Sequence, residues 1–237
     1  MKWFFEEFGS SIISFIVGSI LTWILVNRKN LKIAILSYIN SKKEYRVSMS
    51  YLFRIKIENK YLLIKGKNIE QYQPVGGVYK YYASFSDMLN KYEIRPESGN
   101  SFYEENDLRV YVKGKYLSNL IIWFNSRLNR EYNVYRELLE EFKENGIELT
   151  NDLLDIQIEL IRNVNSGVHY STHFRKNEVL LYDIFDVRLN DQTIEMIKEK
   201  LSENNQLVLV DFVEIESECV NIDNKSCKIG IHAKYLR

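Results

Sequence analysis

The sequence predicts an α+β fold, a mixed β-sheet with flanking helices, preceded by one apolar N-terminal helix. Residues 46–57 alternate apolar and mostly polar side chains, which is typical of a strand. Two later segments, 130–147 and 190–201, space their apolar residues three or four apart, which is typical of helices packed on a sheet. Residues 8–27 carry no charge and are numerous enough to cross a bilayer as a helix.

Composition narrows the possible functions. The 237 residues suffice for one ordinary domain and a short additional segment. The formal net charge is zero, so there is no electrostatic argument for a nucleic-acid polymer as partner. The only cysteines are Cys219 and Cys227, which match neither a secreted disulfide framework nor a zinc pattern. They fit a reducing cytosol, and a single bond between them stays open.

The uncharged segment 8–27 is predicted to be a transmembrane helix. Glu6 and Glu7 precede it and no small-x-small site follows it, which disfavours a cleavable signal peptide. A buried core helix is the other alternative. Lys2 stands alone before the segment, whereas a group of basic residues follows it: Arg28, Lys29, Lys32, Lys42, Lys43 and Arg46. By the positive-inside rule, this asymmetry predicts that the N-terminus lies outside and the C-terminal domain lies in the cytoplasm.

Small residues recur along one face of this segment. Ser10, Ser14 and Gly18 are spaced by four, and such faces let helices approach closely in lipid. The sequence therefore predicts an assembly face, with a monomeric anchor as the alternative. Residues 28–44 are expected to form a basic juxtamembrane linker. Within it, residues 31–39 are apolar but too short to span, so they lie on the inner leaflet or pack on the domain.

The domain is predicted to occupy residues 45–237 and to begin with a long, half-buried strand. Its first elements are expected to be a strand over 46–57, a turn at 58–60 and a partner strand over 61–64. A strand and glycine loop over 73–79, a short helix and loop over 81–96 and a turn at 97–100 follow. Residues 108–112 and 120–124 are each expected to be a strand or a buried segment.

After the helix predicted over 130–147, residues 153–162 admit both a helical and an extended interpretation. Residues 178–189 predict a strand, and 207–215 a second buried strand. Between them, Asn190 is expected to cap a helix that ends near Leu201. His169 and His173 are spaced by four, but their Ser, Thr and Gly neighbours indicate a loop and not a metal site.

The acidic helix over 130–147 is the most distinctive stretch. Val134, Leu138 and Phe142 form its apolar stripe, and Gly146 is expected to end it. The side of the helix opposite this stripe is predicted to carry four carboxylates, three or four residues apart: Glu137, Glu140, Glu141 and Glu144. Closely spaced carboxylates repel one another, so they form either a solvated acidic face or a site for Mg²⁺ and, through it, a phosphate.

The motif Arg136-Glu137-Leu138-x-Glu140-Glu141 resembles the core of the Nudix box. In that family the helix glutamates bind a divalent metal on a nucleoside diphosphate, and the arginine orients one of them. The resemblance thus implies Glu137, Glu140 and Glu141 as metal ligands, with Mg²⁺ as a possible cofactor. The chain departs from the box because Gly146 comes three residues late. The similar Pro-x-Gly-Gly segment at Gly76-Gly77 also lies far upstream, with no glutamate at the box spacing.

Further segments sharpen the resemblance: Gln-Tyr-Gln-Pro-Val-Gly-Gly-Val-Tyr-Lys from Gln71, Asp-Leu-Arg-Val-Tyr-Val from Asp107, Ile-Trp-Phe-Asn from Ile122, and the repeated Arg-Glu at 130 and 136. Together they resemble the Nudix-like domain encoded beside cyclic-oligonucleotide synthases in bacterial CBASS antiphage operons, where it follows transmembrane helices. The resemblance covers roughly residues 45–236.

That family implies a membrane effector. Its Nudix-like domain senses a cyclic oligonucleotide, and homo-oligomeric assembly of the helices then disrupts the inner membrane and aborts infection. The expected ligand-binding residues are Gln73, Lys80, Arg109, Arg136, Glu137, Glu140 and Glu141. A membrane-anchored Nudix hydrolase using Mg²⁺ with Arg136, Glu137, Glu140 and Glu141 is the alternative, so enzymatic activity stays open. A structural anchor or adaptor is a third class.

Overall fold

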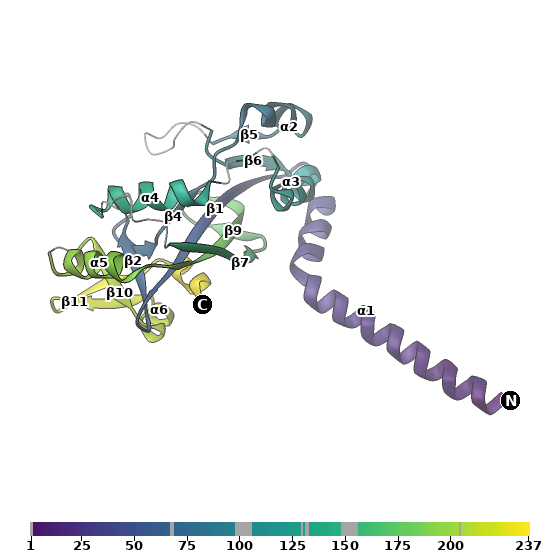
Figure 1. The fold of residues 1–237 in the computed structure, drawn as a ribbon. Coiled ribbons are helices and arrows are strands. Elements are labelled where there is room, and N and C mark those ends of the chain that lie inside the picture. Colours follow the sequence, from purple (N-terminus) through teal and green to yellow (C-terminus); the bar gives the residue numbers. More distant parts are fainter. Residues whose placement is uncertain are drawn as a thin grey trace.

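The computed structural model describes residues 2–66, 69–97, 106–128, 130, 133–147, 156–203 and 205–237, with side chains from residue 14 onward. It confirms the α+β prediction, because a large mixed sheet carries helices on its faces (Figure 1). A two-stranded ribbon, β11 (Cys219–Ile222) and β12 (Lys225–Lys228), accompanies the sheet. The sequence analysis did not predict this ribbon.

The sheet is built around β1 (Glu44–Ile57). This strand pairs in parallel with β9 (Lys176–Arg188), from Arg46 opposite Glu178 to Ile55 opposite Val187. On its other edge it pairs antiparallel with β6 (Arg109–Lys113) and β4 (Gly76–Val78), and its end forms a hairpin with β2 (Lys60–Lys65). The predicted strand and hairpin at 46–64 are therefore confirmed.

The prediction that the first strand is half-buried is wrong, because both faces of β1 are covered. Its odd-numbered residues from Val47 to Ile57 pack under α3 (Gly114–Ser126), α4 (Val134–Glu144) and α5 (Asp191–Glu203). On the opposite face, Leu52 joins a second apolar cluster with residues of α6 (Phe212–Ser217), β11 and η3 (Ile231–Leu236). Alternation along a strand says which residues share a face, and it does not say whether the other face stays in water.

Two apolar runs differ from the strands considered for them. Of the two alternatives for residues 120–124, the buried segment is confirmed and the strand is wrong, because they belong to α3, where Leu117, Leu120, Ile121 and Phe124 are buried at helical spacing. The strand predicted over 207–215 ends early, as β10 (Leu207–Val210).

After β10, Asp211 caps α6 (Phe212–Ser217). Its side chain accepts hydrogen bonds from the backbone N–H groups of Val213 and Glu214, and the Glu214 carboxylate accepts one from the Asp211 N–H in return. This reciprocal capping box starts a helix where apolar content alone suggested a longer strand.

Other expectations hold. Asn190 accepts a hydrogen bond from the Thr193 N–H at 2.8 Å and begins α5. Of the two interpretations for residues 153–162, the extended one is confirmed from Gln157 onward by β7 (Gln157–Asn165), and residues 153–155 lie outside the described part. Residues 98–100 of the turn predicted at 97–100 also lie outside it. The remaining elements are β3 (Tyr72–Pro74), η1 (Ala83–Phe85), α2 (Ser86–Lys91), β5 (Arg95–Pro96), β8 (His169–Ser171) and η3 (Ile231–Leu236).

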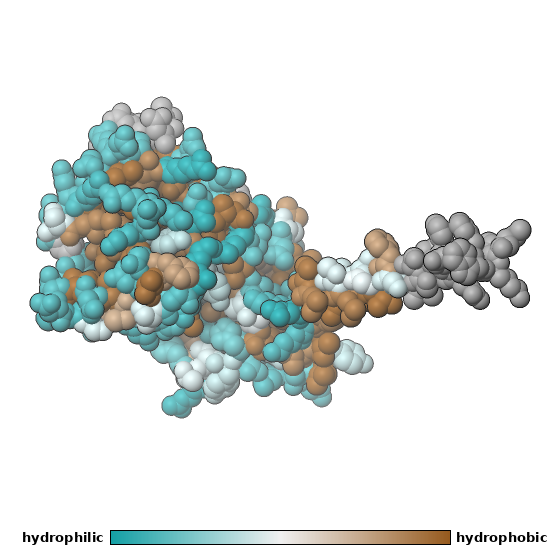
Figure 2. All heavy atoms as spheres, turned by 90° about the horizontal axis from the view of Figure 1, so that it is seen from below, coloured by the Kyte–Doolittle hydropathy of each residue, from teal (hydrophilic) through white to brown (hydrophobic). Residues whose placement is uncertain are grey.

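The N-terminal helix α1 (Lys2–Ile39) runs as one element through most of the predicted linker. Its last turns dock on the domain through one face, with Ile33 and Ser37 buried beside α3, whereas Ile35, Tyr38 and Ile39 of the same segment are exposed. The described residues before these turns, from Ser14 onward, project away from the domain and expose apolar side chains (Figure 2). Within the described residues, no helix is both long and apolar enough to cross a membrane; the side chains of residues 1–13 lie outside them.

Candidate functional site

The acidic helix of the sequence is α4. The side chain of Asn133 accepts a hydrogen bond from the Arg136 N–H at 3.2 Å and caps its start. Leu138 and Phe142 are buried against the sheet, as the apolar stripe predicted. Gly146 has a φ of +77° and lies just past the helix end, so its role as the residue that terminates the helix is confirmed.

The predicted carboxylate face is not uniform, because Glu137 is buried while Glu140 and Glu144 are exposed. At 3.6 residues per turn, Glu141 lies only about 20° from Val134 around the helix, so it borders the apolar stripe and does not oppose it. Glu137 lies on the same border. The placement of all four glutamates on one exposed face was therefore wrong.

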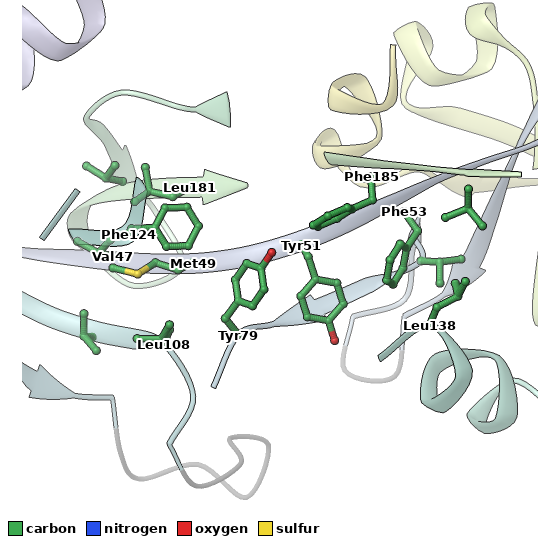
Figure 3. Packing of buried hydrophobic residues seen from close by; sticks show 14 of the residues in the cluster. Val47, Met49, Tyr51, Phe53, Tyr79, Leu108, Phe124, Leu138, Leu181 and Phe185 are labelled. Carbon is green, nitrogen blue, oxygen red and sulfur yellow. The ribbon is translucent and has the colours of Figure 1, made fainter. Parts of the chain in front are cut away.

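Two side chains hold Glu137. The hydroxyl of Tyr51, on β1, donates a short hydrogen bond to Glu137 Oε2, and Arg136 Nη2 donates to Oε1 at 2.8 Å. Burial raises the pKa of Tyr51, and its bond to the Glu137 carboxylate raises that pKa further. Tyr51 therefore stays a neutral donor. In Figure 3 its ring lies among the buried aromatic residues between β1 and α4.

The glycine pair far upstream in sequence lies directly under this helix. A Cβ added at Gly77 would come within 2.4 Å of Tyr51 Oη and 3.4 Å of Glu141 Oε1. Gly76 has a φ of +155°, and a Cβ there would lie 2.2 Å from the Tyr51 carbonyl oxygen. The fold thus joins the two separated parts of the Nudix-like motif, because β4 pairs with β1 beneath α4.

Arg136 links the buried and exposed glutamates. Besides its contact with Glu137, its Nε lies 3.7 Å from Glu140 Oε1. This is the position expected of an arginine that orients a glutamate. Within the described chain, no three His, Cys, Asp or Glu residues are grouped as a metal site would require. Because Glu137 is already engaged, these carboxylates do not fit Mg²⁺ in this arrangement, and the ligand set Glu137, Glu140 and Glu141 stays a prediction.

The other predicted ligand residues, Gln73, Lys80 and Arg109, lie on or beside β3, β4 and β6. Lys80 follows β4 and forms a β-bridge with Asp107, whose carboxylate pairs with Arg109 at 2.5 Å. Gln73 lies on β3, opposite Ile64 of β2. The predicted set therefore occupies three places, namely α4, the start of β6, and β3. The predicted assembly residues are on α1, where Ser14 and Gly18 are exposed and Ser10 lies outside the described side chains.

A buried ionic cluster around Asp183, which the sequence did not predict, lies beside this site. Asp183 of β9 and Arg130, which precedes α4, form an ion pair at 2.8 Å with both side chains fully buried. Tyr79 donates to the same carboxylate at 2.8 Å, and Asn163 donates to its other oxygen. Burial raises the pKa of Tyr79, so it too remains a neutral donor. The available signal was one charge inside the otherwise apolar run 179–185.

The loop predicted around His169 is wrong at that residue, because His169 lies on β8. Its Nε2 is 3.0 Å from Glu178 Oε1. Glu178 in turn pairs with buried Arg46 at 3.0 Å, and Arg46 also pairs with Glu97. This second ionic network ties β1, β8 and β9 together at the sheet end opposite the β1–β2 hairpin.

Comparison with known proteins supports one family. A family model described as the SMODS-associated NUDIX domain matches residues 44–237, which begin where β1 begins. No curated protein matches the chain. The match covers most of the chain, including α4, the glycine pair and the whole sheet. The protein therefore belongs to the SMODS-associated NUDIX domain family, the Nudix-like family associated with CBASS.

Proposed function

We propose that this protein is a membrane effector of a CBASS antiphage system. Its Nudix-like domain binds a cyclic oligonucleotide, and ligand-driven homo-oligomerisation brings the α1 helices together in the inner membrane, which they then disrupt. Residues 8–27 span the bilayer in this proposal, with the N-terminus outside and the domain in the cytoplasm.

The observation that carries the proposal is that α1 is one continuous helix, with apolar side chains exposed along its projecting part and its other end docked on the domain. The helix has 38 residues, which corresponds to about 57 Å at 1.5 Å per residue. Large apolar side chains such as Phe15, Leu21 and Trp23 are more than half exposed along its projecting part. Its other end is anchored by Ile33, so association of the domains would constrain the helices.

The ligand is proposed to bind beside α4. Arg136 offers a partly exposed guanidinium there, with 46% of its side-chain surface accessible, and guanidinium groups recognise phosphate. The full proposed set is Gln73, Lys80, Arg109, Arg136, Glu137, Glu140 and Glu141. Selective binding to the assembled state is what would make the ligand a trigger.

One observation favours a second candidate, a membrane-anchored Nudix hydrolase. The Arg136–Glu137 contact and the approach of Gly77 to Glu141 reproduce the spatial relation that the Nudix box implies. Such a hydrolase would need Mg²⁺ for Lewis-acid chemistry, and Glu137 would first have to exchange its contacts with Tyr51 and Arg136 for the metal.

Two measurements separate these functions. Purified full-length protein is incubated with Mg²⁺ and nucleoside diphosphate derivatives, and the effector proposal expects no turnover. Multiple turnover that Glu140→Gln and Glu141→Gln abolish would establish the hydrolase instead. In cells, co-expression with a cyclic-oligonucleotide synthase should depolarise the inner membrane, whereas the catalytically dead synthase should not. Depolarisation that is equal in both cases would contradict ligand gating.

A further inference from the structure

A polar pocket of about 400 Å³ lies where α1 joins the domain, between α1, β7 and η3. This volume falls within the range of small-molecule sites. Its lining includes Lys29, Asn30, Arg162, Asn165, Lys234 and Tyr235. Three of these side chains are cationic, and the lining contains no carboxylate. The pocket is separate from α4, none of whose residues line it.

Two of the three cations are not neutralised by a carboxylate. Lys29 Nζ donates to the Asn165 carbonyl at 3.1 Å, and Arg162 Nη2 donates to the Tyr235 carbonyl. Within the described part of the chain, neither lies within ion-pair distance of an acid, whereas Lys234 pairs with Glu218 at 2.6 Å. Two positive charges thus face one cavity with only neutral acceptors around them, which favours an anionic ligand.

We infer that this pocket binds a phosphodiester group, with Lys29 and Arg162 contacting the same anion. Carbonyl-bound ammonium and guanidinium groups keep further N–H donors for phosphate oxygens. The amides of Asn30 and Asn165 meet beside it at 3.3 Å and complete a polar rim. The source is either a soluble nucleotide or the headgroup of an anionic lipid.

Such a ligand would fasten α1 to the domain. Lys29 belongs to the helix, and Arg162 belongs to β7 at the far edge of the sheet. Figure 1 shows β7 ending on the side of the domain from which α1 departs. One bound anion therefore bridges two elements that are otherwise linked here by single polar contacts. Its presence would fix the angle at which α1 leaves the domain.

The test uses the full-length chain in a neutral detergent. Two phosphodiester probes are added separately, the dinucleotide ApA and phosphatidylglycerol, with phosphatidylcholine as the zwitterionic reference. Thermal unfolding and titration measure binding. The double variant Lys29→Ala/Arg162→Ala should lose affinity by on the order of tenfold or more for each cation, because hydrogen bonds to charged groups are that strong. Lys32→Ala/Lys225→Ala removes equal charge from exposed positions outside the pocket and should bind as the parent does.

The charge-preserving pair Lys29→Arg/Arg162→Lys controls for folding and should retain most of the binding. A response to ApA identifies a nucleotide site, and a response to phosphatidylglycerol identifies a lipid site. The inference is overturned if neither probe binds the parent, or if the double variant binds as tightly as the parent. Because no α4 residue lines the pocket, loss of probe binding in Lys29→Ala/Arg162→Ala assigns the probe to this pocket and not to the ligand site proposed at α4.

Discussion

At the residue scale, buried charge is the most specific feature of this domain. Asp183 lies fully buried on β9 and accepts hydrogen bonds from Arg130, Tyr79 and Asn163. The Arg130 guanidinium also lies 4.0 Å from the Tyr79 ring centroid. An isolated charge in such a place would be strongly destabilising, and only this set of partners makes it tolerable. The cluster fixes the segment before α4 onto the sheet.

The first prediction is that Asp183→Asn destabilises the fold by about 3–5 kcal/mol, because it leaves the Arg130 charge buried without its counter-charge. Urea unfolding of the full-length protein measures this change. The matched control is Asp186→Asn on the same strand, whose carboxylate pairs with Arg54 at 2.7 Å and is partly exposed. That change should cost about 1 kcal/mol or less. Equal losses for the two variants would contradict the special role of Asp183.

A second residue-scale prediction concerns acid sensitivity. Burial lowers the pKa of His232 below its ordinary value of 6.5, and its Nδ1 lies 2.9 Å from the Tyr182 hydroxyl. Below pH 6.5 the unfolded chain takes up a proton at this histidine more readily than the folded chain does. The contribution of His232 is therefore complete above pH 6.5 and is lost as pH falls toward the folded-state pKa.

The unfolding free energy of the parent should accordingly decline below pH 6.5, before the carboxylates titrate. His232→Gln cannot titrate and should flatten this part of the profile, measured by urea unfolding across pH. A parental slope in His232→Gln would show that other groups cause the acid sensitivity.

At the element scale, the close packing of β1, β4 and α4 defines the Nudix-like site. Three separate chain segments supply Tyr51, Gly77 and Glu141, and the space between them excludes even a methyl group at Gly77. The buried Tyr51 hydroxyl then reaches Glu137. The glycine pair is needed because the strand must approach the tyrosine and the helix at once.

Gly77→Ala is therefore predicted to destabilise the protein by about 1–3 kcal/mol, since its Cβ must displace the Tyr51 phenol. In combination with Tyr51→Leu, which removes the obstructing atoms, the loss should be smaller than the sum of the single losses by on the order of 1 kcal/mol. Chemical denaturation of the four proteins gives this coupling energy. Gly18→Ala, where no atom lies within 4 Å and alanine favours the helix, is the control that should not destabilise the protein. Strict additivity would contradict the proposed contact.

At the scale of the whole molecule, the two faces of the large sheet are covered by different elements. Its helical face carries α3, α4 and α5, and α3 also contacts the base of α1. Its other face is closed by α6, β11 and η3. The apolar part of α1 lies outside this arrangement and exposes Gly18 with open space around it. This helix face is the proposed assembly surface.

The whole-molecule prediction is that Ser10→Leu/Ser14→Leu/Gly18→Leu abolishes membrane depolarisation. The three changes raise hydrophobicity, so insertion should survive, but branched side chains prevent close helix approach. Membrane fractionation checks insertion, and a potential-sensitive dye in cells that also express the synthase checks activity. The control Ile13→Leu/Val17→Leu/Ile20→Leu alters only bulky positions and should remain active. Full depolarisation by the small-face variant would show that assembly uses another surface.

The sequence by itself determined the elements whose signals are local. Alternation predicted β1, and three-four spacing predicted α4 and α5, because these periods reflect which side chains share a face. Capping at Asn190 and termination at Gly146 depend on neighbours a few residues away, so they too could be read directly. The Arg136–Glu141 motif identified the family for the same reason.

Tertiary structure decided everything that depends on distant partners. The chain alone did not indicate that β9 would pair in parallel with one edge of β1, or that separate groups of elements would cover both faces of β1. Nor did it reveal that Tyr51 would reach Glu137, or that Arg130 would meet Asp183, since these pairs are 86 and 53 residues apart. The sequence lists the charges and hydroxyls, but only folding determines which of them are buried away from water. Those buried groups must then pair or hydrogen-bond with one another.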